Sequence, residues 1–310
     1  MEILSGLDAL PDPRLRSPIV TWGVFDGVHR GHRRVLSQVL GWARAEGVSS
    51  ALVTFDRHPE EVLRGKSVPL VTPLGERLRL IGDLGLDFCV VINFTLDFSK
   101  TSAEEFIRDF IAGRMTAHGI VLGHDSRFGH DRTGDLAFLE GLGRKVGLEV
   151  RHSEPELFEG RPVSSSLIRD AVFAGRLKEA TFLLGRPPAV FGTVVKGDRR
   201  GTKLGFPTAN LELHHAVRPP GGVYAAEVPL DGKLYRAVVN IGTRPTFREN
   251  GAEVIEAHLL DYAGGDLYGR AVEVRFLDRL RDEQKFDGPD SLKRRIQADI
   301  DLARQLSPRA

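Results

Sequence analysis

The chain is organised around the stretch Gly23-Val24-Phe25-Asp26-Gly27-Val28-His29-Arg30-Gly31-His32. An apolar run, residues 19–22, comes directly before it. Apolar residues with the spacing of one helical face follow it, namely Val35, Leu36, Val39, Leu40 and Ala43. This pattern predicts a strand, a tight turn and a helix.

The predicted turn has the features of a phosphate site. Its three glycines let the backbone approach a ligand without a Cβ in the way, and the N-terminus of the next helix offers amide donors to an anion. His29 and His32 lie at this point, where two imidazoles can donate hydrogen bonds to a phosphoryl group as its charge develops. Histidines at this spacing also occur as capping or solvated residues, so the short pattern alone leaves both interpretations open.

In its longer form, Gly-x-Phe-Asp-Gly-x-His-x-Gly-His, the stretch resembles the adenylyltransferase half of the bacterial bifunctional riboflavin kinase/FAD synthetase family. Its His-x-Gly-His core is similar to that of the nucleotidyltransferase superfamily. The resemblance implies that His29 and His32 are catalytic. It also implies an ATP-binding role for Gly23, Phe25, Asp26 and Gly31.

Length and composition exclude several classes of protein. A chain of 310 residues is long enough for two domains with separate cores. Lys and Arg total 43 against 42 Asp and Glu, so no global field attracts nucleic acid or an anionic membrane. The single cysteine, Cys89, excludes an internal disulfide and a Cys-rich metal cluster. No apolar leader or bilayer-length stretch is present, and we expect a cytoplasmic protein.

The first half of the chain alternates between strand and helix patterns. Strands are predicted at 19–22, 51–55, 88–92, 120–122 and 148–150, and helices around 32–46, 73–84, 102–115 and 134–143. The alternation predicts a parallel sheet with helices on both faces, and the resemblance implies a Rossmann-like nucleotidyltransferase domain. Ligands of such sheets bind beyond the carboxyl ends of the strands, where the glycine and histidine turn falls.

Polar loops follow the second and fourth predicted strands, and each alone could be an ordinary loop. They resemble family segments of the patterns Thr-Phe-Asp/Glu-Pro-His-Pro and Gly-x-Asn/Asp-Phe-x-Phe-Gly. The resemblance implies that Asp125 reaches the adenosine or its phosphates, and that His58 and Phe128 contact the flavin. Arg57 replaces the usual proline and Ser126 the usual aromatic residue.

The run Ser164-Ser165-Ser166-Leu167-Ile168-Arg169 predicts a helix N-terminus, because hydroxyl side chains cap helices well. The same hydroxyls, together with an arginine one turn into the helix, also suit a triphosphate. The run resembles the family's Ser-Ser-Ser/Thr-x-Ile-Arg motif, which implies that Ser164, Ser165 and Arg169 bind ATP phosphates.

Helices at 166–174 and 176–184 are predicted to close the first domain. Gly185-Arg186-Pro187-Pro188 has the composition of a linker. We therefore expect an FMN adenylyltransferase domain at 1–185 and a riboflavin kinase domain at 186–310 on the family resemblance.

The second half is mostly β. Predicted strands at 222–228 and 233–239 flank an Asp-Gly turn, and further strands follow at 254–260 and 271–276. Strands this short predict a small antiparallel β-barrel. Leu292, Ile296 and Ile300 mark one face of a C-terminal helix that covers the barrel.

The second half opens with two glycine-rich runs, residues 192–197 and 201–210. On physical grounds this sequence is either a nucleotide-binding loop or an ordinary β-turn. Thr208 and Asn210 can offer oxygen ligands to Mg²⁺. The segment 204–211 resembles the riboflavin kinase signature, although Thr202 replaces a usual arginine. The implied ATP-binding residues are Gly197, Gly205, Pro207, Thr208 and Asn210, with Thr208 and Asn210 as metal ligands.

Three further residues take roles from the resemblance alone. Glu256 is implied to be the general base that takes the proton of the ribityl 5′-hydroxyl for attack on the γ-phosphate of ATP. Arg281 and Phe286 resemble the flavin-facing segment. By its spacing alone, Glu256 would be a solvent-facing strand residue.

The resemblance spans nearly the whole chain and implies two reactions: riboflavin to FMN, then FMN to FAD, both with ATP. Three alternatives stay open at this point. A nucleotidyltransferase of another class, such as a cytidylyltransferase, could share His29 and His32. The chain could also be a non-catalytic flavin-binding module, or a zinc protein that uses those histidines with His58.

Overall fold

The computed structural model describes residues 1–197, 201, 204–243 and 253–306, and it divides into two compact units. The first unit contains Met1–Val68 and Leu74–Ser164. The second contains Pro69–Pro73 and Ser165–Ala310. The short segment Pro69–Pro73 thus packs with the second unit although its sequence lies inside the first.

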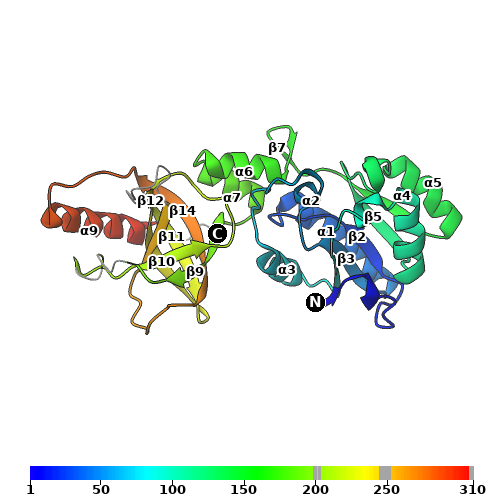
Figure 1. Ribbon diagram of the computed structural model, residues 1–310, viewed down its shortest axis with the longest axis horizontal. Helices are drawn as coiled ribbons and strands as arrows, with labels where there is room; N and C mark the ends of the chain where they lie inside the picture. Colours follow the sequence, from blue (N-terminus) through cyan, green and yellow to red (C-terminus); the bar gives the residue numbers. More distant parts are fainter. Residues whose placement is uncertain (198–200, 202–203, 244–252, 307–310) are drawn as a thin grey trace. The chain divides into compact units, whose positions relative to one another are not determined.

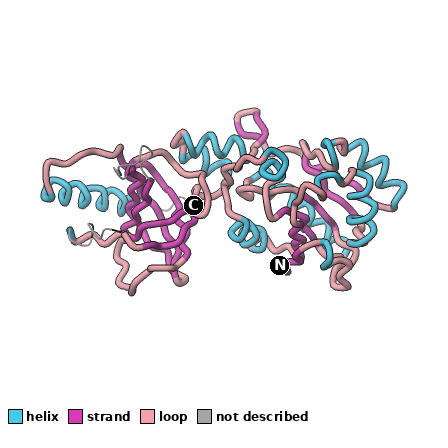
Figure 2. The backbone as a smooth tube through the Cα atoms, viewed as in Figure 1, coloured by secondary structure: helices cyan, strands magenta, loops and turns pink. Residues whose placement is uncertain are grey.

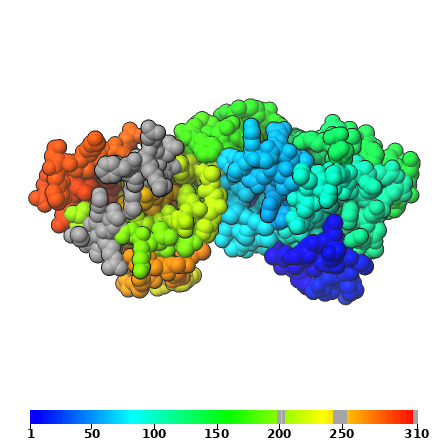
Figure 3. Space-filling view, viewed as in Figure 1, coloured from blue at the N-terminus to red at the C-terminus, as the bar shows by residue number. Residues whose placement is uncertain are grey.

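A six-stranded parallel sheet forms the centre of the first unit (Figure 1), in the order β1-β4-β3-β2-β5-β6. The strands are β1 (Glu2–Ser5), β2 (Ile19–Trp22), β3 (Ser50–Phe55), β4 (Phe88–Ile92), β5 (Gly119–Gly123) and β6 (Glu149–Ser153). This arrangement confirms the predicted parallel sheet. Strand β1 is an addition to the prediction. It is short, mostly exposed and visible at the surface (Figure 3), so it carries no apolar pattern.

Helices cover both faces of this sheet. They are α1 (Arg30–Glu46), α2 (Pro59–Arg64), α3 (Leu74–Gly82), α4 (Ala103–Glu105), the π-helix η3 (Phe106–Arg114) and α5 (Leu136–Val146). The remaining elements are the 3-10 turns η1 (Leu7–Ala9), η2 (Phe98–Lys100) and η4 (His130–Arg132), and the hairpin of β7 (Leu157–Phe158) and β8 (Arg161–Pro162). The predicted helix at 102–115 is therefore α4 followed by a π-helix.

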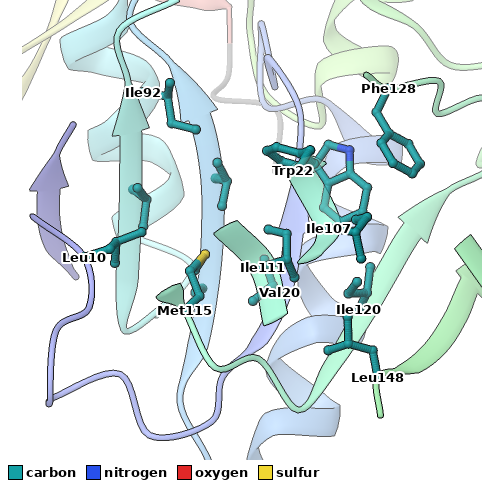
Figure 4. Packing of buried hydrophobic residues seen from close by; sticks show 14 of the residues in the cluster. Leu10, Val20, Trp22, Ile92, Ile107, Ile111, Met115, Ile120, Phe128 and Leu148 are labelled. Atoms are coloured by element: carbon teal, nitrogen blue, oxygen red, sulfur yellow. The ribbon is translucent and has the colours of Figure 1, made fainter. Parts of the chain in front are cut away.

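Neighbouring residues of β2 point into different cores, which shows why the helices lie on both sides. Ile19 packs with Leu36 of α1 and Ile81 of α3. Val20 packs on the opposite face with Ile111 of η3, in the cluster shown in Figure 4. A side chain of this size contributes roughly 2 kcal/mol when it is fully buried.

The second unit is a closed antiparallel barrel (Figure 2), in the order β10-β13-β12-β11-β14-β9. Its strands are β9 (Ala189–Val195), β10 (Ala209–Leu213), β11 (Gly222–Leu230), β12 (Lys233–Thr243), β13 (Glu253–Leu259) and β14 (Ala271–Arg281). Helix α9 (Pro289–Gln305) packs on its outside through Ile300 and Ala303. The predicted barrel and its covering helix are confirmed.

Two helices precede the barrel in the second unit, α6 (Ser165–Phe173) and α7 (Leu177–Leu184). Leu177 of α7 belongs to the apolar cluster that fills the barrel. The inserted segment Pro69–Pro73 is attached through His215, whose Nδ1 lies 3.2 Å from the Leu70 carbonyl oxygen. The Phe191 amide donates to Nε2 of the same ring, so the neutral ring carries its proton on Nδ1 and donates it to Leu70.

Candidate functional site

The loop between β2 and α1, residues 23–29, is held in an unusual backbone conformation. Phe25 and Val28 have φ angles of 53° and 41°, a left-handed region that β-branched and bulky residues rarely adopt. Both side chains are buried, and the Val28 amide donates to the Phe25 carbonyl at 3.1 Å. Backbone strain of this kind persists only where packing over-determines it, and it clusters at ligand-binding loops.

His29 and His32 form a stacked pair at the start of α1. Their ring centroids are 3.5 Å apart and the ring planes differ by 19°. The His32 amide donates to Nδ1 of His29, which is therefore the N-cap of the helix. Because Nδ1 accepts this bond, a neutral His29 carries its proton on Nε2. The capping role is thus real, and it leaves Nε2 as the donor nitrogen of His29.

The glycines of this stretch make room for its own aromatic rings. A Cβ on Gly31 would lie 3.2 Å from the His29 ring and 3.3 Å from the Val163 carbonyl oxygen. A Cβ on Gly23 would lie 3.1 Å from the ring of Phe25. The Phe25 ring packs against the His32 ring, with centroids 4.7 Å apart. Gly23 and Gly31 thus serve internal packing, in addition to the close approach of a ligand that the sequence predicts.

Asp26 is buried at 2% exposure, and its charge acts on a second buried charge that the sequence did not predict. Arg77 of α3 is equally buried and donates from Nη2 to the Phe55 carbonyl at 2.6 Å. Burial lowers the pKa of Arg77, and the Asp26 carboxylate is the strongest influence that opposes this lowering. Arg77 lies four residues before Ile81, on the buried stripe of α3, and this spacing is the signal that could have revealed it.

A cavity of about 730 Å³ opens beside the end of β2. Four of the predicted site residues line it: Gly23, His58, Asp125 and Phe128. Aromatic side chains outside the predicted site complete the walls: Trp22, Phe55, Phe94, Phe98 and Phe106. Figure 4 shows Trp22 beside Phe128, and their ring centroids are 5.0 Å apart, edge to face. Such a cavity suits a large planar ring.

The polar residues of this cavity come from loops at strand ends. His58 caps α2, since its Nδ1 accepts from the Glu60 amide at 3.2 Å. The side chain of Asp125 follows β5 and is 80% exposed. Ser126 is half-buried and its amide donates to the Gly123 carbonyl in the turn after β5. Arg57 is exposed, so neither departure from the family pattern is fully buried.

The serine run spans the division between the two units. Ser164 ends the first unit, directly after the Val163 carbonyl that approaches Gly31. Ser165 begins α6 in the second unit, where Arg169 donates to the Ser166 hydroxyl at 3.5 Å. Ser164 therefore belongs to the same unit as the histidine loop, whereas Ser165 and Arg169 belong to the other unit.

In the barrel, strand register brings the predicted kinase residues together. Asn210 of β10 lies opposite Glu256 of β13, which lies opposite Asn240 of β12. Their sequence neighbours Leu211, Ile255 and Ile241 fill the barrel interior, so these three polar residues share its outer face. Asn240 was not predicted as a site residue, and only the strand register reveals it.

The glycine-rich segment lies against the proposed metal ligands. A Cβ on Gly197 would overlap the Asn210 side-chain amide, and one on Gly201 would lie 3.1 Å from Oγ1 of Thr208. Gly205 has a φ of 91°, and it and Pro207 are exposed. Thr202 lies outside the described residues. Hydroxyl and amide oxygens fit the preference of Mg²⁺, whereas the described residues contain no group of three or more His, Cys, Asp or Glu side chains suited to a metal.

Arg281 is held by the covering helix. Its guanidinium donates to the Asp299 carboxylate at 2.8 and 3.0 Å, and Asp299 of α9 is 1% exposed. The same guanidinium lies 5.7 Å from the centre of the Phe286 ring. The structure therefore brings Arg281 and Phe286 together, with α9 as their support.

Comparison with known proteins extends over both units. A family model described as FAD synthetase matches residues 12–167, and one described as riboflavin kinase matches residues 184–307. The bifunctional riboflavin kinase/FMN adenylyltransferase of Pseudomonas fluorescens is 36% identical over 307 residues, covering 99% of this chain and 98% of the relative. That of Bacillus subtilis is 35% identical, covering 91% and 90%.

A crystal structure from Streptococcus pneumoniae has the same fold, with a TM-score of 0.86 and 31% identity. It covers 99% of this chain and 100% of the streptococcal one, which its description calls a macrolide-efflux protein. In the described part of the present chain, no helix is both long and apolar enough to cross a membrane. With both family models matched in order and relatives aligned along nearly its whole length, the chain belongs to the bifunctional riboflavin kinase/FMN adenylyltransferase family.

Proposed function

We propose that this chain makes FAD from riboflavin in two steps. In the barrel unit, ATP and riboflavin give FMN and ADP. In the first unit, a second ATP and FMN give FAD and diphosphate. The observation that carries the proposal is the stacked pair of His29 and His32 at the start of α1, which follows a loop whose Gly23 lines an aromatic cavity. The pair suits a phosphoryl group, and the cavity suits a flavin ring.

In the adenylyl transfer, an FMN phosphate oxygen attacks the α-phosphorus of ATP, and the bond to diphosphate breaks. His29 and His32 donate hydrogen bonds to the oxygens on which charge develops, so no covalent enzyme intermediate is required. Ser164, Ser165 and Arg169 hold the departing phosphates through hydroxyl, amide and guanidinium groups. The nucleotide is held by the loop residues Gly23, Phe25, Asp26 and Gly31.

The flavin ring of FMN occupies the aromatic cavity in this proposal. Phe128 forms one wall together with Trp22, and His58 lies at the edge on the cap of α2. Asp125 faces the adenosine or its phosphates from the exposed end of β5. The planar lining supports stacking of the ring, which contributes about 1 kcal/mol for each aromatic contact.

In the phosphoryl transfer, Glu256 takes the proton of the ribityl 5′-hydroxyl while that oxygen attacks the γ-phosphorus of ATP. Thr208 and Asn210 hold Mg²⁺, which when bound neutralises charge on the ATP phosphates. Gly197, Gly205 and Pro207 shape the backbone around those phosphates. The register that puts Asn210 opposite Glu256 supports this arrangement, since it gives the base and a metal ligand one common face.

In this proposal, Phe286 and Arg281 both contact the flavin of the kinase site. The bond from Arg281 to Asp299 and its contact with the Phe286 ring keep the two side chains together. We place the functional division near residue 185, which is supported by the riboflavin kinase match that begins at residue 184. The proposed partners are small molecules, ATP, riboflavin and FMN, without nucleic acid or membrane. Because both reactions consume ATP, we also propose a cytoplasmic location.

The proposal is tested by incubating purified protein with riboflavin, ATP and Mg²⁺, and with FMN in a parallel reaction. Chromatography of the flavins should show FMN first and FAD later. FMN alone would contradict the assignment of the first unit, and FAD formed only from added FMN would contradict that of the barrel. Replacing ATP by CTP should give neither product, whereas a cytidylyl product would favour another class of nucleotidyltransferase.

A further inference from the structure

The imidazole of His258 connects the strand that carries Glu256 to the segment that carries Thr208. Its Nδ1 lies 2.7 Å from the carbonyl oxygen of Pro207. The ring also meets Phe206 edge to face, with centroids 5.8 Å apart and planes at 89°. His258 follows Glu256 by two residues on β13, so both side chains project from the same face of the barrel.

This contact lies where the backbone ladder between the two strands ends. The ladder of β10 and β13 runs from Leu211 opposite Ile255 to Ala209 opposite Ala257. Pro207 has no amide hydrogen and therefore cannot donate to β13. Beyond Ala209, the bond from His258 to Pro207 continues the connection through a side chain. Thr208 is thus enclosed between the last ladder pair and a side-chain hydrogen bond.

A carbonyl oxygen only accepts hydrogen bonds, so Nδ1 of His258 carries the hydrogen in this contact. That nitrogen is protonated in one neutral tautomer and in the charged imidazolium. The bond therefore does not require a charged ring. What the segment requires is a donor at the position of Nδ1.

We propose that His258 is a positioning residue of the kinase reaction, which fixes Thr208 relative to Glu256. This inference rests on the proposed roles of Thr208, Asn210 and Glu256. Phosphoryl transfer depends mainly on the placement of the metal, the γ-phosphate and the attacking hydroxyl. A displacement of about 1 Å can lower a rate by about a hundredfold. His258 touches neither the phosphates nor the flavin in this scheme and acts through the backbone of Pro207.

Three substitutions in the full chain separate this role from general packing. His258→Asn retains an N–H donor close to the position of Nδ1, whereas His258→Gln places its N–H nearer the position of Nε2. His258→Ala removes the donor at both positions. We expect kcat for riboflavin phosphorylation to fall by about tenfold to a hundredfold in the Ala and Gln variants, with a higher Mg²⁺ requirement. The Asn variant should recover most of the activity.

Two controls accompany these variants. Conversion of added FMN to FAD by the same preparations should be unchanged, because that reaction is assigned to the first unit. His214→Ala removes another barrel imidazole, which is bonded to the Thr193 hydroxyl at 2.8 Å, and it should leave kinase activity unchanged.

Equal kinase activity in all three His258 variants and the wild type would overturn the inference. An equal loss in the Asn and Gln variants would overturn it too, because the position of the donor would then be irrelevant. If the wild type itself lacks kinase activity, the proposed function fails instead. The two failures are therefore distinguishable.

Discussion

The rings of His29 and His32 stack with their centroids 3.5 Å apart, and the backbone amide of His32 donates a hydrogen bond to Nδ1 of His29. The hydrogen bond thus ties the His29 ring to the start of α1, and the His32 ring stacks on it. Replacing one ring therefore removes the stacking partner of the other.

Replacing either histidine should impair FAD synthesis and spare the kinase. We expect His29→Ala and His32→Ala each to lower the rate of FAD formation from FMN by about a hundredfold or more, because each removes a donor from the developing charge. Riboflavin phosphorylation by the same variants, measured by chromatography, serves as the control. An unchanged rate of FAD formation would contradict the role assigned to these side chains.

Adding one methyl group to Gly31 should have a similar but smaller effect. The new Cβ would lie 3.2 Å from the His29 ring and 3.3 Å from the Val163 carbonyl, so the ring must shift. We expect Gly31→Ala to lower FAD synthesis by about tenfold. Gly41→Ala is the matched control in the same helix, since nothing lies within 4 Å of its Cβ. That variant should keep full activity and gain up to about 1 kcal/mol in stability.

Removing the buried charge of Arg77 should destabilise the first unit. Arg77→Met leaves Asp26 buried without the guanidinium, and we expect a loss of about 3 kcal/mol in the free energy of unfolding. Both tryptophans, Trp22 and Trp42, lie in the first unit, so their fluorescence in urea reports this unfolding. Adding Asp26→Asn should recover part of the loss.

The control for this prediction is on the same helix. Arg79 pairs with Glu76 and Asp83 at the surface, where its side chain is 43% exposed. Arg79→Met should cost less than about 1 kcal/mol. Equal losses for Arg77→Met and Arg79→Met would mean that burial of the charge is unimportant.

Replacing Glu256 should impair the kinase alone. Glu256→Gln keeps the shape of the side chain and removes the base, so riboflavin phosphorylation should fall by roughly a hundredfold to ten-thousandfold. FAD formation from added FMN should continue at the wild-type rate. The comparison needs only one preparation and two substrates, and a kinase that retains its full rate would exclude Glu256 as the base.

The only cysteine should be unreactive in the folded protein. Burial raises the pKa of Cys89 from 9.0 to about 12. The neutral thiol therefore contributes stability below pH 9, and this contribution is lost as the pH rises toward 12. At pH 8 a disulfide reagent such as dithiobis-nitrobenzoate should label Cys89 only after denaturation. Rapid labelling of the native protein would contradict its burial.

Apolar periodicity predicted most elements of the fold because the buried strands and helix faces are long enough to show it. In the barrel, strands β9 and β10 were the exception, since their glycines and polar residues resembled a loop. Gly192 has a specific reason to be there: a Cβ would lie 2.6 Å from the Glu212 carbonyl, where the two strands approach closely. A glycine that looks like a turn residue in sequence is thus a site of close strand contact.

The candidate site was predictable where residues lie together in sequence, as His29 and His32 do. Arg77 and Asn240 were missed because tertiary packing, in one case, and strand register, in the other, bring them to the site. No local pattern states that residue 240 lies opposite residue 256. Such partners become visible only once the strands are paired.

The segment Pro69–Pro73, held by the bond between His215 and Leu70, belongs to the barrel unit although the rest of that unit begins at Ser165. The two halves are therefore not contiguous pieces of the chain. A gene cut at the codon for residue 185 would yield a C-terminal fragment that lacks both this segment and helices α6 and α7. For engineering, the two units should therefore be kept in one chain and not exchanged as separate modules.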